Sequence, residues 1–306
     1  MTPVAALDCG TNSTRLLVLD DDGHPLDRRM RVTRLGQGVD ATGELREDAV
    51  ERTLEVLRGY RAVMTDLGVT AGRLAATSAA RDAANGAEFL ERASEVTGVT
   101  AELLSGEEEG RLSFAGATAD LDVPLDTAVV VDIGGGSTEL VQCVDGDLAA
   151  HSMQVGCVRL TERALPGDPP TPAELARASA LVDDAIDEAF ARVPSLATPD
   201  PARRVLGLAG TVSTLAMLDL GLATYDEARV HHHWLGLEAI RRLRDELAAA
   251  TIAQRRDLRG MVEGREDVIV GGAVILERVV VRLGATGCTT SEHDILDGLA
   301  RSVLDR

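Results

Sequence analysis

The chain of 306 residues carries 31 basic and 50 acidic side chains, which gives a formal net charge of −19 at pH 7. Every basic residue is arginine, so a Walker-type phosphate-binding lysine, a lysine Schiff base and a lysine general base are excluded. Because recognition of nucleic acids and of anionic membranes depends on basic patches, the acidic composition argues against both partners.

The length and the 45% hydrophobic content predict two globular domains with buried cores. The longest uninterrupted apolar stretch, residues 268–276, is about half of the roughly 20 residues that cross a bilayer. The N-terminus lacks the basic start and apolar run of a secretory signal, and the four cysteines are scattered without a CxxC pair. We therefore expect a cytoplasmic protein with reduced cysteines.

The first predicted elements are two apolar strands joined by a small polar turn that follows Asp8. The turn residues are Gly10, Thr11, Asn12 and Ser13. Glycine lets backbone N–H groups approach an anion closely, and serine adds a hydroxyl donor, so the turn can bind phosphate oxygens without lysine. A single turn of this kind is better explained as an ordinary hairpin with Asp8 as a turn former.

A helix is expected over residues 47–67, where apolar residues recur at helical spacing. Small residues then precede Arg81 in the segment 76–85. Arg81, like Arg15 in the first hairpin, is able to form a bidentate pair with phosphate. For either arginine taken singly, a surface ion pair is the commoner explanation.

Another helix is expected to start at Ser105, because Ser105 and Glu108 have the spacing of a capping box. Glu109 comes one position later and is left to point elsewhere. A carboxylate beside phosphate and a metal ion can orient and deprotonate a water molecule, as hydrolysis requires. The alternative is that the glutamates only complement the helix dipole at a solvated N-terminus.

A second hairpin repeats the first 124 residues later, with Asp132 in the place of Asp8. Its phosphate-binding candidates are Gly134, Gly135, Gly136, Ser137 and Thr138. Asp8, Asp132 and Glu139 offer the hard oxygen ligands that Mg²⁺ prefers. Two matched turns favour phosphate and metal binding over two ordinary hairpins.

The duplication predicts two domains, residues 1–124 and 125–306, joined near a proline-containing link at 122–126. Further helices are expected over residues 173–193, 237–250, 267–283 and 294–304. The last of these is also expected to be able to return to the first domain. Strands followed by helices in both halves indicate an α/β protein of two lobes, with the turns facing a cleft between them.

Two further motifs have competing explanations. Gly207, Gly210 and Thr211 follow a predicted strand and are able to bind phosphate or a nucleoside, but close packing of a strand on a helix explains the glycines equally well. The run of His231, His232 and His233 is expected to be a loop or a strand edge. Consecutive side chains project in different directions, which argues against a metal site there.

Together these motifs resemble those of the exopolyphosphatase/guanosine pentaphosphate phosphohydrolase (Ppx/GppA) family, within the actin, sugar kinase and Hsp70 ATPase superfamily. The most specific are Ser-Gly-Glu-Glu-Glu-Gly-Arg at 105–111 and Asp-Ile-Gly-Gly-Gly-Ser-Thr-Glu at 132–139. The resemblance implies two ribonuclease-H-like (actin-like ATPase) domains with an interdomain cleft. It also implies the short form of the family, without the extra C-terminal helical domain of long members, and is compatible with a homodimer.

By this resemblance, Glu109 corresponds to the catalytic base, Asp132 and Glu139 to catalytic and metal-binding acids, and Asp8 to the aspartate of the first phosphate turn. The implied activity is release of terminal orthophosphate from inorganic polyphosphate, with short chains favoured, using Mg²⁺ or another hard divalent cation such as Mn²⁺. Long-chain processivity is not expected, because the surface that extends the substrate channel in long members is missing.

Three alternatives stay open. Conversion of guanosine pentaphosphate to the tetraphosphate ranks second, because six aromatic residues offer little material for stacking a guanine. An ATP-using kinase of the superfamily is disfavoured by the glutamate-rich motif. A regulator that holds polyphosphate or a guanosine alarmone without turnover would use the same turns.

The acidic composition limits how a polyanionic substrate is held. Backbone donors, a few arginines such as Arg15 and Arg81, and metal ions recruited to acidic residues would have to supply the positive charge. The sequence therefore predicts weak polyphosphate binding when no divalent cation is present.

Overall fold

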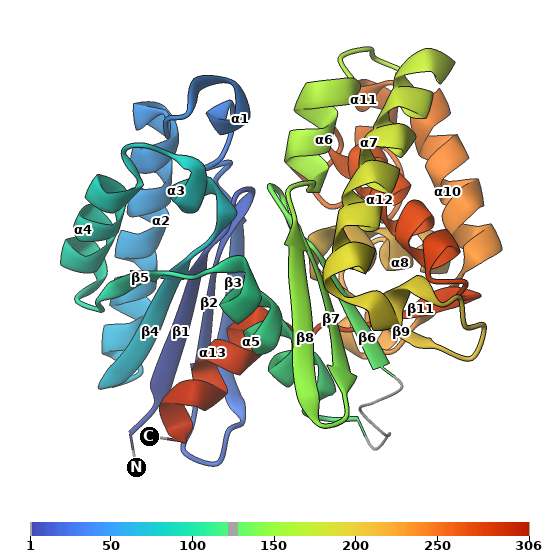
Figure 1. The fold of residues 1–306 in the computed structure, drawn as a ribbon. Coiled ribbons are helices and arrows are strands. Elements are labelled where there is room, and N and C mark those ends of the chain that lie inside the picture. Colours follow the sequence, from blue (N-terminus) through green and yellow to red (C-terminus); the bar gives the residue numbers. More distant parts are fainter. Residues whose placement is uncertain (1, 122–127, 306) are drawn as a thin grey trace. The chain divides into compact units, whose positions relative to one another are not determined.

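The computed structural model describes residues 2–121 and 128–305, which form two compact units (Figure 1). Unit 1 comprises Met1–Ala119 and His293–Arg306, and unit 2 comprises Asp120–Glu292. The predicted link at 122–126, and with it the predicted boundary between residues 124 and 125, lies outside the described residues. That domain boundary stays a prediction.

Unit 1 is built on a five-stranded mixed sheet in the order β3-β2-β1-β4-β5. The strands are β1 (Val4–Cys9), β2 (Ser13–Leu19), β3 (Pro25–Val32), β4 (Ala71–Ala76) and β5 (Ala101–Leu103). The first three pair antiparallel, and β4 and β5 extend the sheet in parallel from β1. The predicted first hairpin is therefore confirmed as β1 and β2.

Helices cover both faces of this sheet. They are α1 (Val39–Thr42), α2 (Glu47–Asp66), α3 (Ser78–Asp82), α4 (Gly86–Thr97), α5 (Gly106–Thr118) and α13 (Ile295–Leu304). Because side chains alternate along a strand, Leu7 of β1 lies in a core that it shares with α2 and α4, whereas Ala6 lies in a core that it shares with α13. Asp8 follows the alternation of Ala6 and is therefore on the α13 face.

Tyr60 links α2 to the first hairpin, because its hydroxyl donates to the Thr14 carbonyl oxygen at 3.0 Å. Burial raises the pKa of Tyr60 to about 12, partly offset by arginines nearby. Since the folded value exceeds the unfolded value of about 10, the folded protein holds this proton more tightly. The stabilisation is present below about pH 10 and is lost as the pH rises through about 12.

We therefore expect Tyr60 to ionise with a midpoint near pH 12 in the folded protein. The measurement is tyrosinate absorbance during an alkaline titration of the Tyr225→Phe variant, in which Tyr60 is the remaining tyrosine. In denaturant the midpoint should return to about 10. A midpoint near 10 in the folded variant would contradict the burial of this hydroxyl.

Helix α13 packs closely on α5, and Figure 1 shows the two helices side by side on one face of the unit 1 sheet. Glycines permit the approach: a Cβ atom at Gly116 would lie 1.9 Å from the Asp294 carbonyl oxygen, and one at Gly298 would lie 2.2 Å from that of Leu112. The helix predicted over residues 294–304 thus lies in unit 1.

Unit 2 contains a six-stranded mixed sheet in the order β10-β11-β9-β6-β7-β8. Its strands are β6 (Ala128–Ile133), β7 (Thr138–Val144), β8 (Asp147–Met153), β9 (Arg204–Leu208), β10 (Trp234–Gly236) and β11 (Gly287–Thr290). From β8 to β11 the pairing repeats that of unit 1, with three antiparallel strands followed by two parallel ones. This repetition confirms the duplicated hairpin and the α/β fold with two mixed sheets, as expected for ribonuclease-H-like domains.

One core fills unit 2 around the buried helix α12. The helices are α6 (Cys157–Ala164), α7 (Pro172–Arg192), the short 3-10 helix η2 (Pro194–Ala197), α8 (Ala209–Leu220), α9 (Glu227–Val230), α10 (Leu237–Ala249), α11 (Ile252–Arg256) and α12 (Ile269–Arg282). The helices predicted over 173–193, 237–250 and 267–283 are confirmed with slightly different ends. Within residues 2–121 and 128–305, no helix is both long and apolar enough to span a bilayer.

Candidate active site

The turn of the first hairpin is held by backbone hydrogen bonds. Gly10 N donates to the Ser13 carbonyl oxygen at 3.0 Å, which closes the hairpin. The following loop also contacts the turn, since Gly36 N donates to the Thr11 carbonyl oxygen at 2.8 Å and Arg34 N to that of Asn12 at 2.9 Å. The predicted phosphate-binding turn is therefore a fixed backbone structure.

Asp8 lies at the end of β1 and is 4% exposed. Its Oδ2 accepts hydrogen bonds from Arg15 Nε at 3.0 Å and Nη2 at 2.7 Å, whereas its buried Oδ1 has no hydrogen-bond partner. Burial raises the pKa of Asp8, and the Arg15 charge opposes that effect. A buried carboxylate oxygen without a hydrogen-bond partner suits coordination of a divalent cation or of its bound water.

Arg15 bridges two carboxylates, and its predicted binding to phosphate stays a prediction. Its Nη1 donates to Asp294 at the N-terminus of α13. Burial works against the charge on Asp294, yet the positive charges of Arg15 and Arg28 hold the pKa of Asp294 below its ordinary value. Asp294 therefore carries a negative charge beside the first turn, which the sequence analysis did not identify.

Among the described residues of unit 1, two buried donor atoms have no hydrogen-bond partner: Asn12 Nδ2 in the turn and Arg81 Nη2 at the end of α3. Unsatisfied buried donors call for an explanation, and an anion such as phosphate would supply the missing acceptors. Both residues were predicted from the sequence to bind phosphate, and that assignment stays a prediction.

Glu109 lies in the first turn of α5 and is 9% exposed. Its Oε2 accepts from Arg81 Nη1 at 3.4 Å, and the same Nη1 donates to the Leu104 carbonyl oxygen at 3.0 Å. Arg81 thus places the predicted catalytic base beside a guanidinium that also has an unsatisfied donor. A carboxylate so held is able to accept a proton from water while the guanidinium faces an anion.

The capping box predicted at the start of α5 is only half formed. Ser105 Oγ accepts from Glu108 N at 3.2 Å, as expected, so Ser105 is the N-cap. The Glu108 carboxylate contacts Arg73 Nη2 at 3.4 Å, where the capping box would have turned it back to the Ser105 backbone. The partly buried arginine offers a charge-assisted contact that the local motif does not contain.

The second hairpin turn is held by the N-terminus of α6. The carbonyl oxygen of Gly134 accepts from Cys157 N at 2.9 Å, and that of Gly135 accepts from Val158 N at 2.9 Å. The Thr138 hydroxyl donates to the Val155 carbonyl oxygen at 2.6 Å. That hydroxyl, predicted as a phosphate donor, therefore also helps to join the hairpin to the segment that leads into α6.

Asp132 and Glu139 are brought together by the register of this hairpin. They are directly opposite each other in the antiparallel pair of β6 and β7, so their side chains point to the same face of the sheet. Asp132 is 7% exposed and Glu139 is 1% exposed, and Ser152 Oγ donates to Glu139 Oε1 at 2.7 Å. Two adjacent buried carboxylates form a donor set that suits a hard divalent cation.

The two hairpins differ at one equivalent position. The residue opposite Asp8 is Arg15, whereas the residue opposite Asp132 is Glu139. The first hairpin therefore pairs its aspartate with a positive charge, and the second pairs it with another carboxylate. Because like charges repel unless a cation lies between them, the second hairpin is the better cation site.

The third glycine-rich stretch joins β9 to α8 by a sharp turn. Ala209 has a left-handed backbone with φ of 65°, which is rare for residues other than glycine and is found at functional turns. Gly207 packs against Val212, which supports the packing explanation for that glycine. Thr211 is buried, and its hydroxyl oxygen would be 2.4 Å from a Cβ atom at Gly272.

Gly210 leaves room for Arg265, a residue that the sequence analysis missed. A Cβ atom at Gly210 would lie 1.7 Å from Arg265 Nη2, so the guanidinium covers the backbone of this turn. Arg265 is 8% exposed. In the sequence, Gly210 followed by Thr211 indicates a position where another group approaches the backbone. It does not indicate that this group is the distant Arg265.

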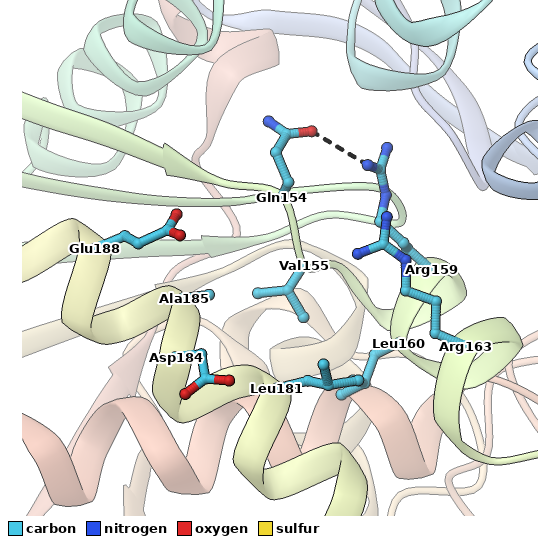
Figure 2. A pocket seen from close by; sticks show the side chains of 9 residues that line it. All are labelled: Gln154, Val155, Arg159, Leu160, Arg163, Leu181, Asp184, Ala185 and Glu188. Atoms are coloured by element: carbon cyan, nitrogen blue, oxygen red, sulfur yellow. Dashed lines mark hydrogen bonds between the residues drawn. The ribbon is translucent and has the colours of Figure 1, made fainter.

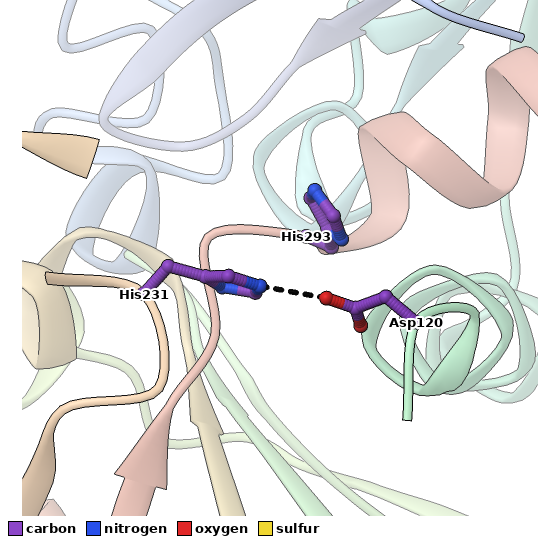
Figure 3. A group of neighbouring side chains, drawn as sticks. All are labelled: Asp120, His231 and His293. Carbon is purple, nitrogen blue, oxygen red and sulfur yellow. Dashed lines mark hydrogen bonds and ion pairs between the residues drawn. The ribbon is translucent and has the colours of Figure 1, made fainter. Parts of the chain in front are cut away.

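The histidine run is a loop that leads into the edge strand β10, which confirms the structural expectation. His231 Nδ1 accepts from Glu292 N at 3.1 Å, so its Nε2 carries the hydrogen and donates to Asp120 Oδ2 at 2.7 Å (Figure 3). His233 Nε2 is 3.0 Å from Asp219 Oδ2. The rings of His231 and His232 stack with centroids 3.8 Å apart, and His232 Nε2 is 3.6 Å from the same Asp120 oxygen. The expectation that consecutive histidines diverge therefore holds for His233 and is wrong for His231 and His232.

A cavity of about 220 Å³ lies between α6 and α7 in unit 2 (Figure 2). Arginine and carboxylate side chains surround an apolar floor that includes Val155 and Leu181. The full lining is Gln154, Val155, Arg159, Leu160, Arg163, Leu181, Asp184, Ala185 and Glu188. None of these residues was predicted to belong to the phosphate or metal site.

The repeated strand order and the matched hairpins define an α/β protein of two units, with buried acidic residues at both hairpins. A sequence model described as the Ppx/GppA phosphatase family matches residues 17–306. The chain therefore belongs to the Ppx/GppA phosphatase family, a family of hydrolases, which confirms the resemblance seen in its motifs.

Individual relatives agree with this assignment over nearly the whole chain. Exopolyphosphatase 2 of Mycobacterium tuberculosis is 41% identical over 319 residues, and the match covers 99% of each chain. The crystal structure of an exopolyphosphatase-like protein is 40% identical with a TM-score of 0.91 and covers 98% of each chain. The Aquifex aeolicus family member is 30% identical with a TM-score of 0.81, covering 99% of this chain and 98% of that one.

Proposed function

We propose that this protein is an exopolyphosphatase that releases terminal orthophosphate from inorganic polyphosphate, preferentially from short chains. The 41% identity to a protein named exopolyphosphatase 2 supports polyphosphate as the substrate. The observation that carries the reaction class is the buried pair of Asp132 and Glu139 on one face of a glycine-rich hairpin. A metal-assisted hydrolase needs such a pair beside a turn that can hold phosphate.

Glu109 is the proposed general base. It accepts the proton of a water molecule whose oxygen forms the new bond to the terminal phosphorus, while the phosphoanhydride bond to the shortened chain breaks. Arg81 holds the Glu109 carboxylate and has an unsatisfied buried Nη2 that is able to donate to a phosphate oxygen.

Ppx/GppA phosphatases generally depend on a divalent metal ion. In unit 2, Asp132 and Glu139 would hold the cation. In unit 1, the buried Oδ1 of Asp8 has no hydrogen-bond partner and is a further candidate ligand. We propose Mg²⁺ or Mn²⁺, since carboxylate oxygens favour hard cations. The bound cation would neutralise charge on the phosphate oxygens.

The remaining substrate contacts are proposed for the two glycine-rich turns, Gly10–Ser13 and Gly134–Thr138, as predicted from the sequence. Phosphate binding at Gly207, Gly210 and Thr211 stays a prediction, because Val212, Arg265 and Gly272 pack against these residues. Backbone N–H groups in such turns bind phosphate oxygens without lysine, which this chain lacks. The homodimer that is compatible with the resemblance also stays a prediction.

We expect purified protein to release orthophosphate from short-chain polyphosphate with Mg²⁺ or Mn²⁺, and to lose this activity when EDTA removes the cation. A colorimetric phosphate assay over polyphosphates of defined length measures both effects. Guanosine pentaphosphate, assayed in the same preparation, should give the lower kcat/KM. No phosphate release from any polyphosphate would contradict the proposed function, and a higher kcat/KM for guanosine pentaphosphate would reassign the substrate.

A further inference from the structure

Arg15 lies between two buried carboxylates of unit 1, Asp8 and Asp294, each 4% exposed. Its Nε and Nη2 both donate to Oδ2 of Asp8, and its Nη1 donates to Oδ2 of Asp294. A guanidinium that meets a single carboxylate commonly contacts both of its oxygens in a bidentate pair. The contact of Arg15 with only one oxygen of Asp8 therefore has a specific cause in the surrounding structure.

Asp294 is fixed at the N-terminus of α13 by a reciprocal capping box. Its Oδ1 accepts from Leu296 N at 2.9 Å, and its backbone N donates to Asp297 Oδ2 at 3.0 Å. Its carbonyl oxygen lies against Gly116 of α5 at a distance that leaves no room for a Cβ atom. The remaining oxygen, Oδ2, is therefore presented to Arg15 from a rigid position.

We propose that Asp294 is a positioning residue for Asp8 and acts through Arg15. Asp294 holds Nη1 of Arg15, so the guanidinium occupies Oδ2 of Asp8 and leaves the buried Oδ1 without a hydrogen-bond partner. The unpartnered oxygen then serves as a ligand for a divalent cation or its bound water. The identity of the cation ligand rests on the proposed function. The effect of Asp294 on the position of Arg15 does not, because it depends only on contacts within the protein.

The packing of α13 on α5 also relates the position of Asp8 to that of the proposed base, Glu109. Glu109 lies in the first turn of α5, and α5 packs on α13 through Gly116 and Gly298. Close contact between two helix backbones leaves little freedom for sliding. The positions of Asp8 and Glu109 within unit 1 thus both depend on the pair α5 and α13. Glu109 is part of α5, and Asp8 of β1 is connected to α13 through Arg15 and Asp294.

The test is the Asp294→Asn variant. Asparagine caps helices about as well as aspartate, so α13 should keep its N-terminus while the charge that attracts Arg15 is lost. In a crystal structure of the variant, we expect Arg15 to contact both Asp8 oxygens. Calorimetric titration with Mn²⁺ alone, without phosphate, should show a Kd raised by about 10-fold, as for other residues that orient a metal ligand.

Asp27→Asn is the control, since Asp27 lies in β3 of the same unit and pairs with Arg29. It should leave both the Arg15 contacts and the Mn²⁺ Kd unchanged. In an Arg15→Gln background, adding Asp294→Asn should have no further effect on the Mn²⁺ Kd, because the two residues act as one unit.

The positioning role is overturned if Arg15 still contacts only Oδ2 of Asp8 in the Asp294→Asn crystal structure, or if Asp27→Asn weakens Mn²⁺ binding equally. The proposed function fails by a different result, namely absence of phosphate release from polyphosphate by the wild-type protein. The crystallographic comparison needs neither substrate nor metal, so the two failures are distinguishable.

Discussion

Replacing Glu109 with glutamine is expected to lower kcat for polyphosphate hydrolysis by about 10²–10⁴-fold, the usual contribution of a general base. The amide cannot accept the proton of the attacking water. Its oxygen is still able to accept from Arg81 Nη1, the partner of the native carboxylate, so the fold and substrate binding should persist. Steady-state kinetics with saturating divalent cation measure the change.

Glu107→Gln provides the control in the same helical turn. Glu107 is exposed and pairs with Arg111 at 2.9 Å, so the variant loses the same charge at the N-terminus of α5 without touching Arg81. Its kcat should stay near that of the wild type. Equal losses in both variants would indicate that the glutamates act only on the helix dipole, and an unchanged rate for Glu109→Gln would refute the base assignment.

Gly156 is the N-cap of α6 and lies against the turn of the second hairpin. We expect Gly156→Ala to displace the backbone of that turn. A Cβ atom at Gly156 would lie 2.5 Å from the carbonyl carbon and oxygen of Gly135 and 2.6 Å from Ser137 N. These neighbours are backbone atoms, so the turn must move. Since a displacement of about 1 Å can cost about 10²-fold in rate, we expect kcat/KM to fall by about that factor.

The same substitution should lower the free energy of unfolding by about 1–3 kcal/mol, the usual cost of overpacking. Chemical denaturation measures this loss, and phosphate release measures kcat/KM. Gly59→Ala is the control, because no neighbouring atom lies within 4 Å of its added Cβ. In the middle of α2 that change should add about 0.5–1 kcal/mol of stability and leave activity unchanged; full activity of Gly156→Ala would contradict the role of the second turn.

The sequence predicted those parts of the site that depend on neighbouring residues. Both hairpins and the Ser105 N-cap are local structures, and the repeat places Asp8 and Asp132 at the ends of equivalent strands. Once the hairpins were identified, the strand register made Asp132 and Glu139 face each other. These features need only the alternation of a strand and the hydrogen bonding of one helical turn.

The rest depends on contacts between distant residues. Arg15 and Asp294 are 279 positions apart, and only the packing of α13 on the first sheet brings them together. Arg265 fills the space at Gly210 for a similar reason. At Glu108 a contact with a distant residue replaces a local one. The Glu108 carboxylate contacts Arg73 and does not form the capping interaction that the motif predicted.

The position of α13 also bears on how the protein is made. Unit 2 is continuous in the chain, whereas unit 1 needs both Met1–Ala119 and His293–Arg306. Until α13 has left the ribosome, the face of the first sheet that includes Ala6 and Leu17 lacks the apolar side chains of that helix, which cover it in the folded protein. Unit 2 is therefore expected to complete its fold first during synthesis. During that time the α13 face of the first sheet stays exposed to solvent.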